Sequence, residues 1–120
     1  MKGICFKYFK IEEFSCPDCG KNEISLNLVH MLDQARKIAG IPFKITSGYR
    51  CEKHNKEVGG KPDSEHLRGF AVDIACSNSR SRFLIERSLF LVGFDRIGED
   101  DNFIHVGVDK NKPKNVKWRY

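Results

Sequence analysis

A carboxylate inside an apolar strand is the feature that most constrains how this chain of 120 residues can fold. Residues 70–74 read Phe-Ala-Val-Asp-Ile, a composition typical of a buried strand, and Asp73 interrupts it. A carboxylate is almost never buried without a cation, a metal or hydrogen-bond donors. A second apolar strand, over residues 103–108, carries His105 on the face opposite its apolar side chains. We therefore expect the fold to bring His105 to Asp73.

Helical and strand patterns follow one another along the chain, which predicts an α+β fold. The clearest helix is capped by Ser25 and ends at Gly40, and Pro42 prevents its continuation. Further expected elements are helical turns over 51–58, a helix over 79–92, strands over 43–46, 70–74, 94–97 and 103–108, an edge strand over 116–118, a loop over 61–69 and a turn over 98–102. The length is that of one domain, so we expect a single domain over residues 1–120.

Composition narrows the classes of protein and partner. Hydrophobic residues make up 40% of the chain and charged residues 31%, a mixture that supports a packed core and excludes a disordered chain. The net charge of +5 favours anionic partners without choosing among nucleic acid, lipid and cell-wall polymer. No apolar run approaches the ~20 residues of a membrane-spanning helix, and residues 1–7 lack the apolar core of a signal peptide. We therefore expect synthesis in the cytoplasm, no membrane insertion and no disulfide framework.

Two imidazoles and one carboxylate could form a zinc site in this chain. His66 lies in the predicted loop seven residues before Asp73, and His105 is expected to meet Asp73. Two histidines and an acid are a common ligand set for catalytic zinc, with a fourth position left for water. The spacing alone also allows a surface histidine in the loop, a histidine packed in the core and an aspartate that acts as a structural cap or ion-pair partner.

Four motifs occur together in a defined order: Ser47-Gly48-Tyr49-Arg50, residues 55–60, Ser64-x-His66-x-x-Gly69-x-Ala71-x-Asp73 and Phe103-Ile104-His105-Val106. With them the chain resembles, over nearly its whole length, the zinc D-alanyl-D-alanine carboxypeptidase family, which includes phage endolysins and murein endopeptidases of hedgehog-like fold. The resemblance implies a small, mainly antiparallel sheet with flanking helices. It also implies that His66, Asp73 and His105 are the zinc ligands and that Arg50 anchors the substrate.

The residue that accepts a proton from water is less clearly marked. Many relatives carry an acid three residues before the last histidine, where this chain has Asn102. Glu99 lies six residues before His105, the spacing of a metal-side glutamate in the hedgehog-type branch, and strand alternation places Asp101 on the face of His105. We take Glu99 first and Asp101 second as candidate bases, and with Arg50 they form the predicted catalytic set.

Four further positions concern the surroundings of the ligands. Ser64, two residues before His66, could orient a ligand or bind the substrate, or could only cap the loop. Many members carry His-x-Asp where this chain has Gly107. Asp109 could compensate from the same strand face, or could lie in the turn that follows. Trp118 could cover the edge of the sheet or line the substrate groove.

The cysteines allow a second, structural zinc. A Cys-x-x-Cys over residues 16–19 and a Cys-x-x-His over residues 51–54 together supply three thiols and one imidazole. The ligands of that site would be Cys16, Cys19, Cys51 and His54. The alternative is a pair of reduced thiols in a turn, with the third cysteine in the core. Other side chains that we assign to the core are Cys5, Cys76, Phe83, Phe90, Phe94 and Phe103.

The resemblance implies a zinc metallopeptidase that hydrolyses D-alanine-containing peptide bonds of peptidoglycan stem peptides, in which zinc activates water and polarises the carbonyl. Such a protein would be a monomeric DD-carboxypeptidase or endopeptidase of the phage or prophage endolysin type, reaching the wall through a holin-like or other route. Asn102 and Gly107 motivate an alternative, a non-catalytic zinc-binding module that binds wall peptide or protein. A small basic nucleic-acid binder is supported only by the charge and by the possible Cys3His zinc, and we expect no nucleic-acid partner.

Overall fold

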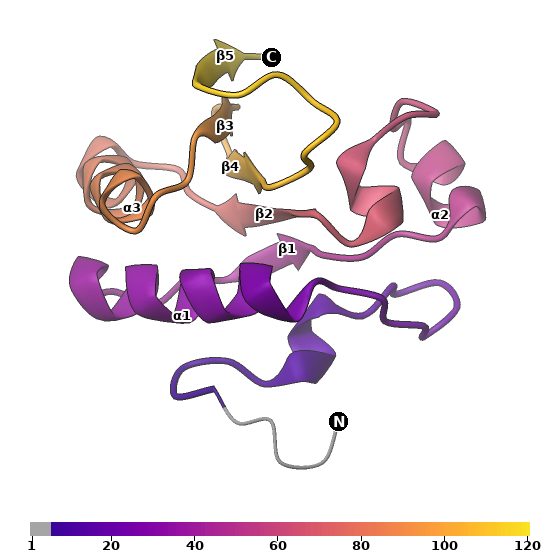
Figure 1. The fold of residues 1–120 in the computed structure, drawn as a ribbon, viewed down its shortest axis with the longest axis horizontal. Helices are drawn as coiled ribbons and strands as arrows, with labels where there is room; N and C mark the ends of the chain where they lie inside the picture. The colour runs from indigo at the N-terminus through magenta and orange to yellow at the C-terminus, as the bar shows by residue number, and fades with distance from the viewer. Residues whose placement is uncertain (1–5) are drawn as a thin grey trace.

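The computed structural model describes residues 6–120, which form five strands and the helices that flank them (Figure 1). The strands are β1 (Ile45–Ser47), β2 (Ala71–Ala75), β3 (Arg96–Glu99), β4 (Phe103–Gly107) and β5 (Val116–Arg119). The α-helices are α1 (Leu26–Ala39), α2 (Glu52–Glu57) and α3 (Ser79–Leu91), and the 3-10 helices are η1 (Ile11–Phe14) and η2 (Glu65–Arg68). The predicted α+β class is therefore confirmed.

The strands form one mixed sheet in the order β1-β2-β4-β3-β5. Neighbouring strands are antiparallel except β3 and β5, which run parallel, so the sheet is mainly antiparallel as expected. Asp73 of β2 lies directly opposite His105 of β4, and Gly98 of β3 lies opposite His105 on its other side. This register brings together the two polar residues that interrupt the apolar strands.

The core lies between the sheet and the helices α1 and α3, which pack against each other. Helix α1 begins where the Ser25 hydroxyl accepts the N–H of Leu28 and ends at Gly40, which has a φ of 71°. Strand β2 contributes Val72 and Ile74 to this core. Because successive strand side chains point to opposite faces, the residues between them face away from the helices. The other face of the sheet is therefore the one on which polar residues can gather.

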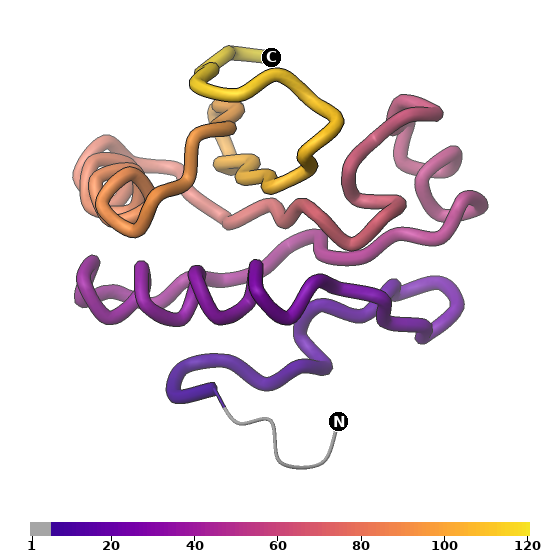
Figure 2. The backbone as a smooth tube through the Cα atoms, viewed as in Figure 1, coloured from indigo at the N-terminus to yellow at the C-terminus, as the bar shows by residue number. Residues whose placement is uncertain are grey.

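Figure 2 shows how the N-terminal part of the chain passes beneath α1 and comes up beside the segment that leaves β1. The N–H of Tyr49 donates to the carbonyl of Phe14 over 2.9 Å, which joins the two segments. A short way along, the side chains of Cys16 and Cys51 meet, with 3.6 Å between their sulfur atoms. The end of β1 is thus tied to a segment about thirty-five residues earlier in the chain.

Several of the predicted core side chains were placed wrongly. Phe94 is buried, but Phe83 and Phe90 of α3 are 64% and 48% exposed, and Phe103 lines a pocket. Helix α3 carries apolar residues on more than one side, and only the side with Leu89 faces the core. An apolar residue in a short helix is therefore not enough to place it in the core.

Some of the remaining elements differ from the expected bounds: the strands predicted over 43–46 and 94–97 are found at Ile45–Ser47 and Arg96–Glu99. Residues 65–68, expected within a loop, form the short helix η2, which ends at Gly69 with a φ of 73°. Cys76 is buried as expected, and Cys5 lies outside the described residues. In the part of the chain that the structure describes, no helix is long and apolar enough to cross a membrane.

Candidate active site

The three residues predicted to bind zinc converge on the face of the sheet away from α1 and α3. His66 comes from η2, Asp73 from β2 and His105 from β4. The carboxylate oxygen Oδ1 of Asp73 lies 3.3 Å from Nε2 of His66 and 3.0 Å from Nδ1 of His105. One ligand atom from each of the three side chains lies within 4.8 Å of the others, and all three are buried. A single small cation could contact all of them.

The ring of His66 is oriented by the segment that follows β1. Its Nδ1 lies 2.8 Å from the carbonyl oxygen of Gly48, which can only accept a hydrogen bond, so Nδ1 carries the proton. In the neutral ring this leaves Nε2 with a lone pair. Nε2 is buried and has no hydrogen-bond partner among residues 6–120, although Asp73 lies near it. An unprotonated nitrogen aimed at a carboxylate is the donor arrangement that a divalent metal requires.

Asp73 and His105 stabilise each other's charged forms. Burial opposes ionisation of Asp73, but the hydrogen bond with His105 and the close approach of His66 outweigh it and hold the pKa of Asp73 well below its usual range. Burial likewise opposes the charged form of His105, and its contacts with Asp73 and Glu65 outweigh that effect and raise its pKa. The site thus keeps a carboxylate ionised in a buried place, as a metal ligand must be.

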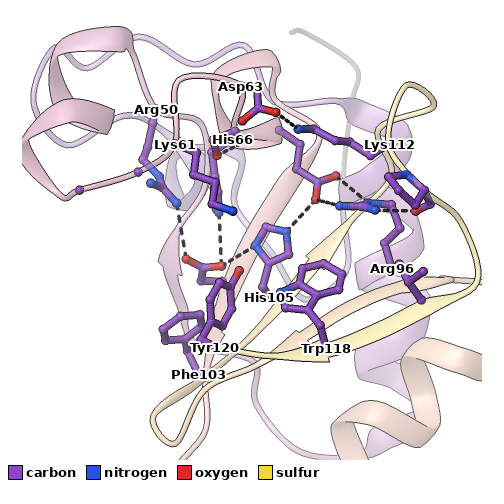
Figure 3. Close-up of a pocket in the computed structure, with 17 residues that line it drawn as sticks. Arg50, Lys61, Asp63, His66, Arg96, Phe103, His105, Lys112, Trp118 and Tyr120 are labelled. Carbon is purple, nitrogen blue, oxygen red and sulfur yellow. Dashed lines mark hydrogen bonds and ion pairs between the residues drawn. The ribbon is translucent and has the colours of Figure 1, made fainter.

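Arg50 lies beside this cluster and is held by its neighbours. Its Nε donates to the Ser47 hydroxyl over 3.1 Å, and its Nη1 donates to Oδ1 of Asn55 over 3.0 Å. Its Nη2 lies 3.8 Å from Oδ2 of Asp73 and faces the pocket (Figure 3). The predicted substrate anchor is therefore brought to the predicted metal ligands, with one edge of its guanidinium still available.

A pocket of about 540 Å³ opens over the cluster. Figure 3 shows Phe103, Tyr120 and Trp118 along one side of it, and Arg50 and Lys61 across from them. Other residues that line it are Asp63, Ser64, Glu65, Arg96 and Lys112. Aromatic walls with cationic side chains nearby suit a peptide that carries a carboxylate. For Trp118 we considered two roles, covering the edge of the sheet and lining the substrate groove. Trp118 belongs to the edge strand β5 and also lines this pocket.

Glu65 is a site residue that the sequence reasoning missed. Its Oε2 lies 2.8 Å from Nε2 of His105 and 2.9 Å from Nη2 of Arg96, and its side chain is buried. Burial opposes ionisation of Glu65, but the contacts with His105 and Arg96 lower its pKa to about 2. Arg96 in turn stacks on the ring of Trp118, with 5.1 Å from its guanidinium to the ring centre. Glu65 therefore orients the side of the His105 ring that faces away from Asp73.

Gly107 explains how the carboxylate of Glu65 fits beneath β4. A Cβ atom at position 107 would lie 2.1 Å from Oε1 and 2.3 Å from Oε2 of Glu65, far too close for any real contact. Because Gly107 has no side chain, it leaves the space that the carboxylate of Glu65 occupies. The sequence held a signal for this exchange. Position 107 is a glycine where the resemblance leads us to expect an acid, and an acid directly precedes His66. Proximity between positions 65 and 107 could not be read from the sequence.

Asp109 and Ser64 form contacts that stabilise the local backbone. Asp109 follows β4, forms an ion pair with Arg68 and accepts the N–H of Asn111 over 2.9 Å, so it lies in the turn, one of the two placements that we considered. It has no contact with His105 among its hydrogen bonds and ion pairs in the described residues. Ser64 accepts the N–H of His66 over 3.3 Å and also lines the pocket, so the capping role is seen and a substrate contact stays a prediction.

The structure does not bring Glu99 to the metal cluster. Residues 98 and 99, expected in a turn, continue β3, and alternation there turns Glu99 away from His105. Glu99 is buried beside Glu86 of α3 and pairs with Lys117 over 2.9 Å. Hydrogen bonds with Glu86 and Lys117 lower its pKa to about 2. This carboxylate belongs to an ion-pair network on the helix side of the sheet.

Asp101 lies in the turn between β3 and β4, two residues before the pocket residue Phe103. Its side chain is 88% exposed and pairs with Arg119 over 2.8 Å. It is not among the residues that line the pocket. The next residue in this turn is Asn102, at the position where the resemblance to the carboxypeptidases leads us to expect an acid.

Three of the four residues predicted for a second zinc lie together, where the N-terminal segment meets the start of α2. One sulfur from each of Cys16, Cys19 and Cys51 lies within 4.8 Å of the others, and the cysteines are not joined by disulfides. His54 is not part of this cluster. Burial opposes ionisation of Cys16, but backbone N–H groups of Cys51, Cys19 and Asp18 outweigh it and lower its pKa to about 7.

Residues 7–107 match the family model described as Peptidase M15. This match covers most of the chain and includes His66, Asp73, His105 and Arg50. The chain belongs to the Peptidase M15 family. M15 members are zinc peptidases, so the family agrees with a hydrolase that binds a metal, and the His66, Asp73 and His105 cluster is a candidate site for that metal.

Among curated proteins, the chain is similar to a protein described as "Probable inorganic carbon transporter subunit DabA" from Dechloromonas aromatica (strain RCB). The two are 26% identical over 84 residues, which is 66% of this chain and 8% of the curated protein. The chain therefore spans a small part of the length of that relative, and the M15 assignment rests on the family match.

Proposed function

We propose that this M15 protein is a zinc-dependent peptidase that hydrolyses D-alanine-containing peptide bonds in peptidoglycan stem peptides. One observation carries the proposal: the unpartnered Nε2 of His66 points at the carboxylate of Asp73, which also binds His105, at the base of an open pocket that Arg50 enters. Family membership supplies the reaction class, and the pocket supports the class of substrate.

The donor set supports His66, Asp73 and His105 as the zinc ligands. Two imidazole nitrogens and one carboxylate oxygen are a ligand set that zinc accepts, and three protein ligands leave one position for water or substrate. When bound there, zinc would lower the pKa of a water molecule and polarise the scissile carbonyl. Gly48 holds the tautomer of His66 through its carbonyl, and Glu65 fixes the ring of His105, so both imidazoles are preorganised.

Arg50 would bind the carboxylate end of the substrate, or a peptide carbonyl in a cross-linked one. Its Nε and Nη1 are already held by Ser47 and Asn55, which limits the orientations of the planar guanidinium. The rest of its donors can form a charge-assisted bond with the substrate. Lys61 and Lys112 add positive charge around the pocket, which favours a terminal carboxylate or an acidic stem residue.

Asp101 is the carboxylate that we propose as proton acceptor from the attacking water. It lies in the exposed turn that leads into Phe103 of the pocket wall, and release of its ion pair with Arg119 would free it to turn inward. Glu99 would have to leave a buried network with Glu86 and Lys117, which costs far more than breaking an exposed pair. Glu65 is unsuited, because its carboxylate is occupied by His105 and Arg96.

Mass spectrometry of purified peptidoglycan digested with the zinc-loaded protein tests the proposal. Loss of a terminal alanine from monomeric muropeptides would identify a carboxypeptidase, and conversion of cross-linked dimers to monomers an endopeptidase. His66→Ala should abolish either product. His30→Ala is the matched control, since His30 is exposed on α1 outside the pocket. Undigested peptidoglycan with wild type and both variants would contradict the proposal.

A second candidate is a zinc-binding module of the same fold that binds wall peptides without cutting them. Asn102 motivates it, and so do the carboxylates among the described pocket residues, because none of the three is free. Asp63 pairs with Lys112, Glu65 with Arg96, and Asp73 with His105. If the protein binds zinc stoichiometrically and binds a D-alanine-terminated peptide, but forms no product after prolonged incubation, the result would favour this module over the peptidase.

For the peptidase we further propose a monomer that acts on the wall after release by a holin-like or other route, as in phage lysis. Its positive charge would favour association with the anionic envelope. Expression in a bacterial host should lyse cells only when the membrane is also permeabilised. Lysis that is equal with His66→Ala would show that the enzyme is not its cause.

A further inference from the structure

We propose that Cys16, Cys19 and Cys51 bind a second zinc ion, which ties the N-terminal segment to the segment that carries Arg50. The proposed peptidase activity does not use these cysteines, and they lie outside the pocket. Their sulfurs nevertheless approach one another within 4.8 Å from two segments far apart in the sequence. This arrangement needs an explanation, because thiols that only fill space are usually buried, and Cys19 is exposed.

The first two cysteines lie in a tight turn that backbone hydrogen bonds hold closed. In Cys16-Pro17-Asp18-Cys19-Gly20, the N–H of Gly20 donates to the carbonyl of Cys16 over 2.9 Å, and the N–H of Cys16 donates to the carbonyl of Lys21 over 2.8 Å. Gly20 has a φ of 74°, which favours glycine. The turn brings the sulfur of Cys19 within 4.8 Å of the sulfur of Cys16, a spacing at which both can bind one metal ion.

The third cysteine completes the set from the start of α2. Cys51 caps that helix, and its sulfur accepts the N–H of His54 over 3.5 Å. Its sulfur lies 3.6 Å from that of Cys16, much farther than the ~2.05 Å of a disulfide bond. Sulfur atoms at this distance can share one metal ion as neighbouring ligands. Lys53 and Asp18 form an ion pair over 3.7 Å that joins the same two segments.

The chemistry of the set points to zinc. Three soft thiolates favour zinc over magnesium or calcium, which prefer oxygen ligands. Among residues 6–120 no histidine or acid joins the cluster, so the fourth ligand of a tetrahedral ion would be water. The predicted ligand His54 contributes its backbone N–H to the sulfur of Cys51 instead of its ring.

The position of the site connects it to the active centre. Cys51 directly follows Arg50, whose N–H donates to the carbonyl of His66 over 3.2 Å. Two residues earlier, the carbonyl of Gly48 orients the ring of His66. A Cβ on Gly48 would lie 2.6 Å from the carbonyl oxygen of Phe14, so the two segments are already in close contact there. A metal ion bound by Cys16 and Cys51 would strengthen the contact between these two segments, and so would help to hold Arg50 and His66 in place. Only this link to the active centre rests on the proposed function.

Cobalt substitution tests the site directly. Cobalt(II) bound to thiolates absorbs strongly in the near ultraviolet through sulfur-to-metal charge transfer, whereas nitrogen and oxygen ligands give no such band. The reduced, full-length protein loaded with cobalt should show this band. The band should persist in His66→Ala and disappear in Cys19→Ser, while Cys76→Ala, which removes a cysteine outside the cluster, should retain it.

Thermal unfolding gives a second measurement. In the His66→Ala background, added zinc should raise the melting temperature by roughly 5–10 °C, because a ligand that binds only the folded state stabilises it. Adding Cys19→Ser should remove this shift. Reduced wild type without the charge-transfer band, or an unchanged zinc-induced shift in the double variant, would overturn the proposal. Neither result depends on peptidase activity, so this site and the proposed function fail separately.

Discussion

Gly107→Ala should destabilise the protein because it displaces the carboxylate of Glu65. The new Cβ would lie 2.1 Å from Oε1 of Glu65, and ordinary contact begins at 3.4 Å, so the carboxylate has to withdraw by about 1.3 Å. Such a shift breaks its bonds of 2.8 Å to His105 and 2.9 Å to Arg96. The charged partners then stay buried without their carboxylate.

The size of the effect follows from these contacts. Breaking a buried ion pair from one side costs about 3–5 kcal/mol. Replacing glycine by alanine within a strand returns about 0.5–1 kcal/mol. The free energy of unfolding should therefore fall by about 2–4 kcal/mol. With a urea dependence of about 2 kcal/mol per molar, the midpoint of urea unfolding should fall by roughly 1–2 M.

The assay is urea unfolding of the metal-free protein, followed by circular dichroism, as a double-mutant cycle. In a Glu65→Ala background the space beneath β4 is empty, so Gly107→Ala should be neutral or slightly stabilising there. Gly107→Asp should also be tolerated better in that background, because its carboxylate would enter the space that Glu65 vacates. A wild-type midpoint for Gly107→Ala, or an equal loss in both backgrounds, would refute the reasoning.

Three further predictions concern separate parts of the molecule. Arg50→Lys keeps the charge but loses the planar fork, so kcat/KM on a D-alanine-terminated peptide should fall about 10–100-fold; an unchanged value would exclude Arg50 as the anchor. Asp101→Asn should lower kcat by about 10²–10⁴-fold while Glu99→Gln leaves it unchanged, and the reverse pattern would make Glu99 the base. Burial and the contact with Glu99 raise the pKa of Glu86, so this group stabilises the fold fully below its ordinary pKa and loses that contribution as pH rises. The stability of Glu86→Gln relative to wild type should therefore increase in chemical unfolding as pH rises above the ordinary pKa of a glutamate, and a pH-independent difference would contradict this coupling with Glu99.

Local patterns in the sequence were sufficient to predict most elements of the fold. Helix α1 carries its own cap and stop at Ser25 and Gly40, and β2 and β4 are apolar strands with one polar residue each. That polar residue is also the strongest signal for the site. Because a buried carboxylate must find a partner, the strand that carries Asp73 predicted a meeting with His105, and the register confirms it.

The position of Glu99 depended on where strand β3 ends, which the sequence did not predict correctly. The turn between β3 and β4 was expected to begin at Gly98, which would have left Glu99 free to face the metal ligands. In the structure β3 continues through Glu99, because its backbone pairs with β4 on one side and β5 on the other. A change of one position along a strand reverses the face of a side chain, so this acid lies on the helix side.

The sequence by itself therefore supplied the candidates for chemistry in this protein: two histidines, an aspartate and an arginine for the predicted active site, and three cysteines and a histidine for a possible second zinc. Only the tertiary structure decided that Glu65 supplies the carboxylate that orients His105. The physical reason is that the carboxylate of Glu65 fills the space that a side chain at position 107 would need, and the folded chain alone brings these two positions together.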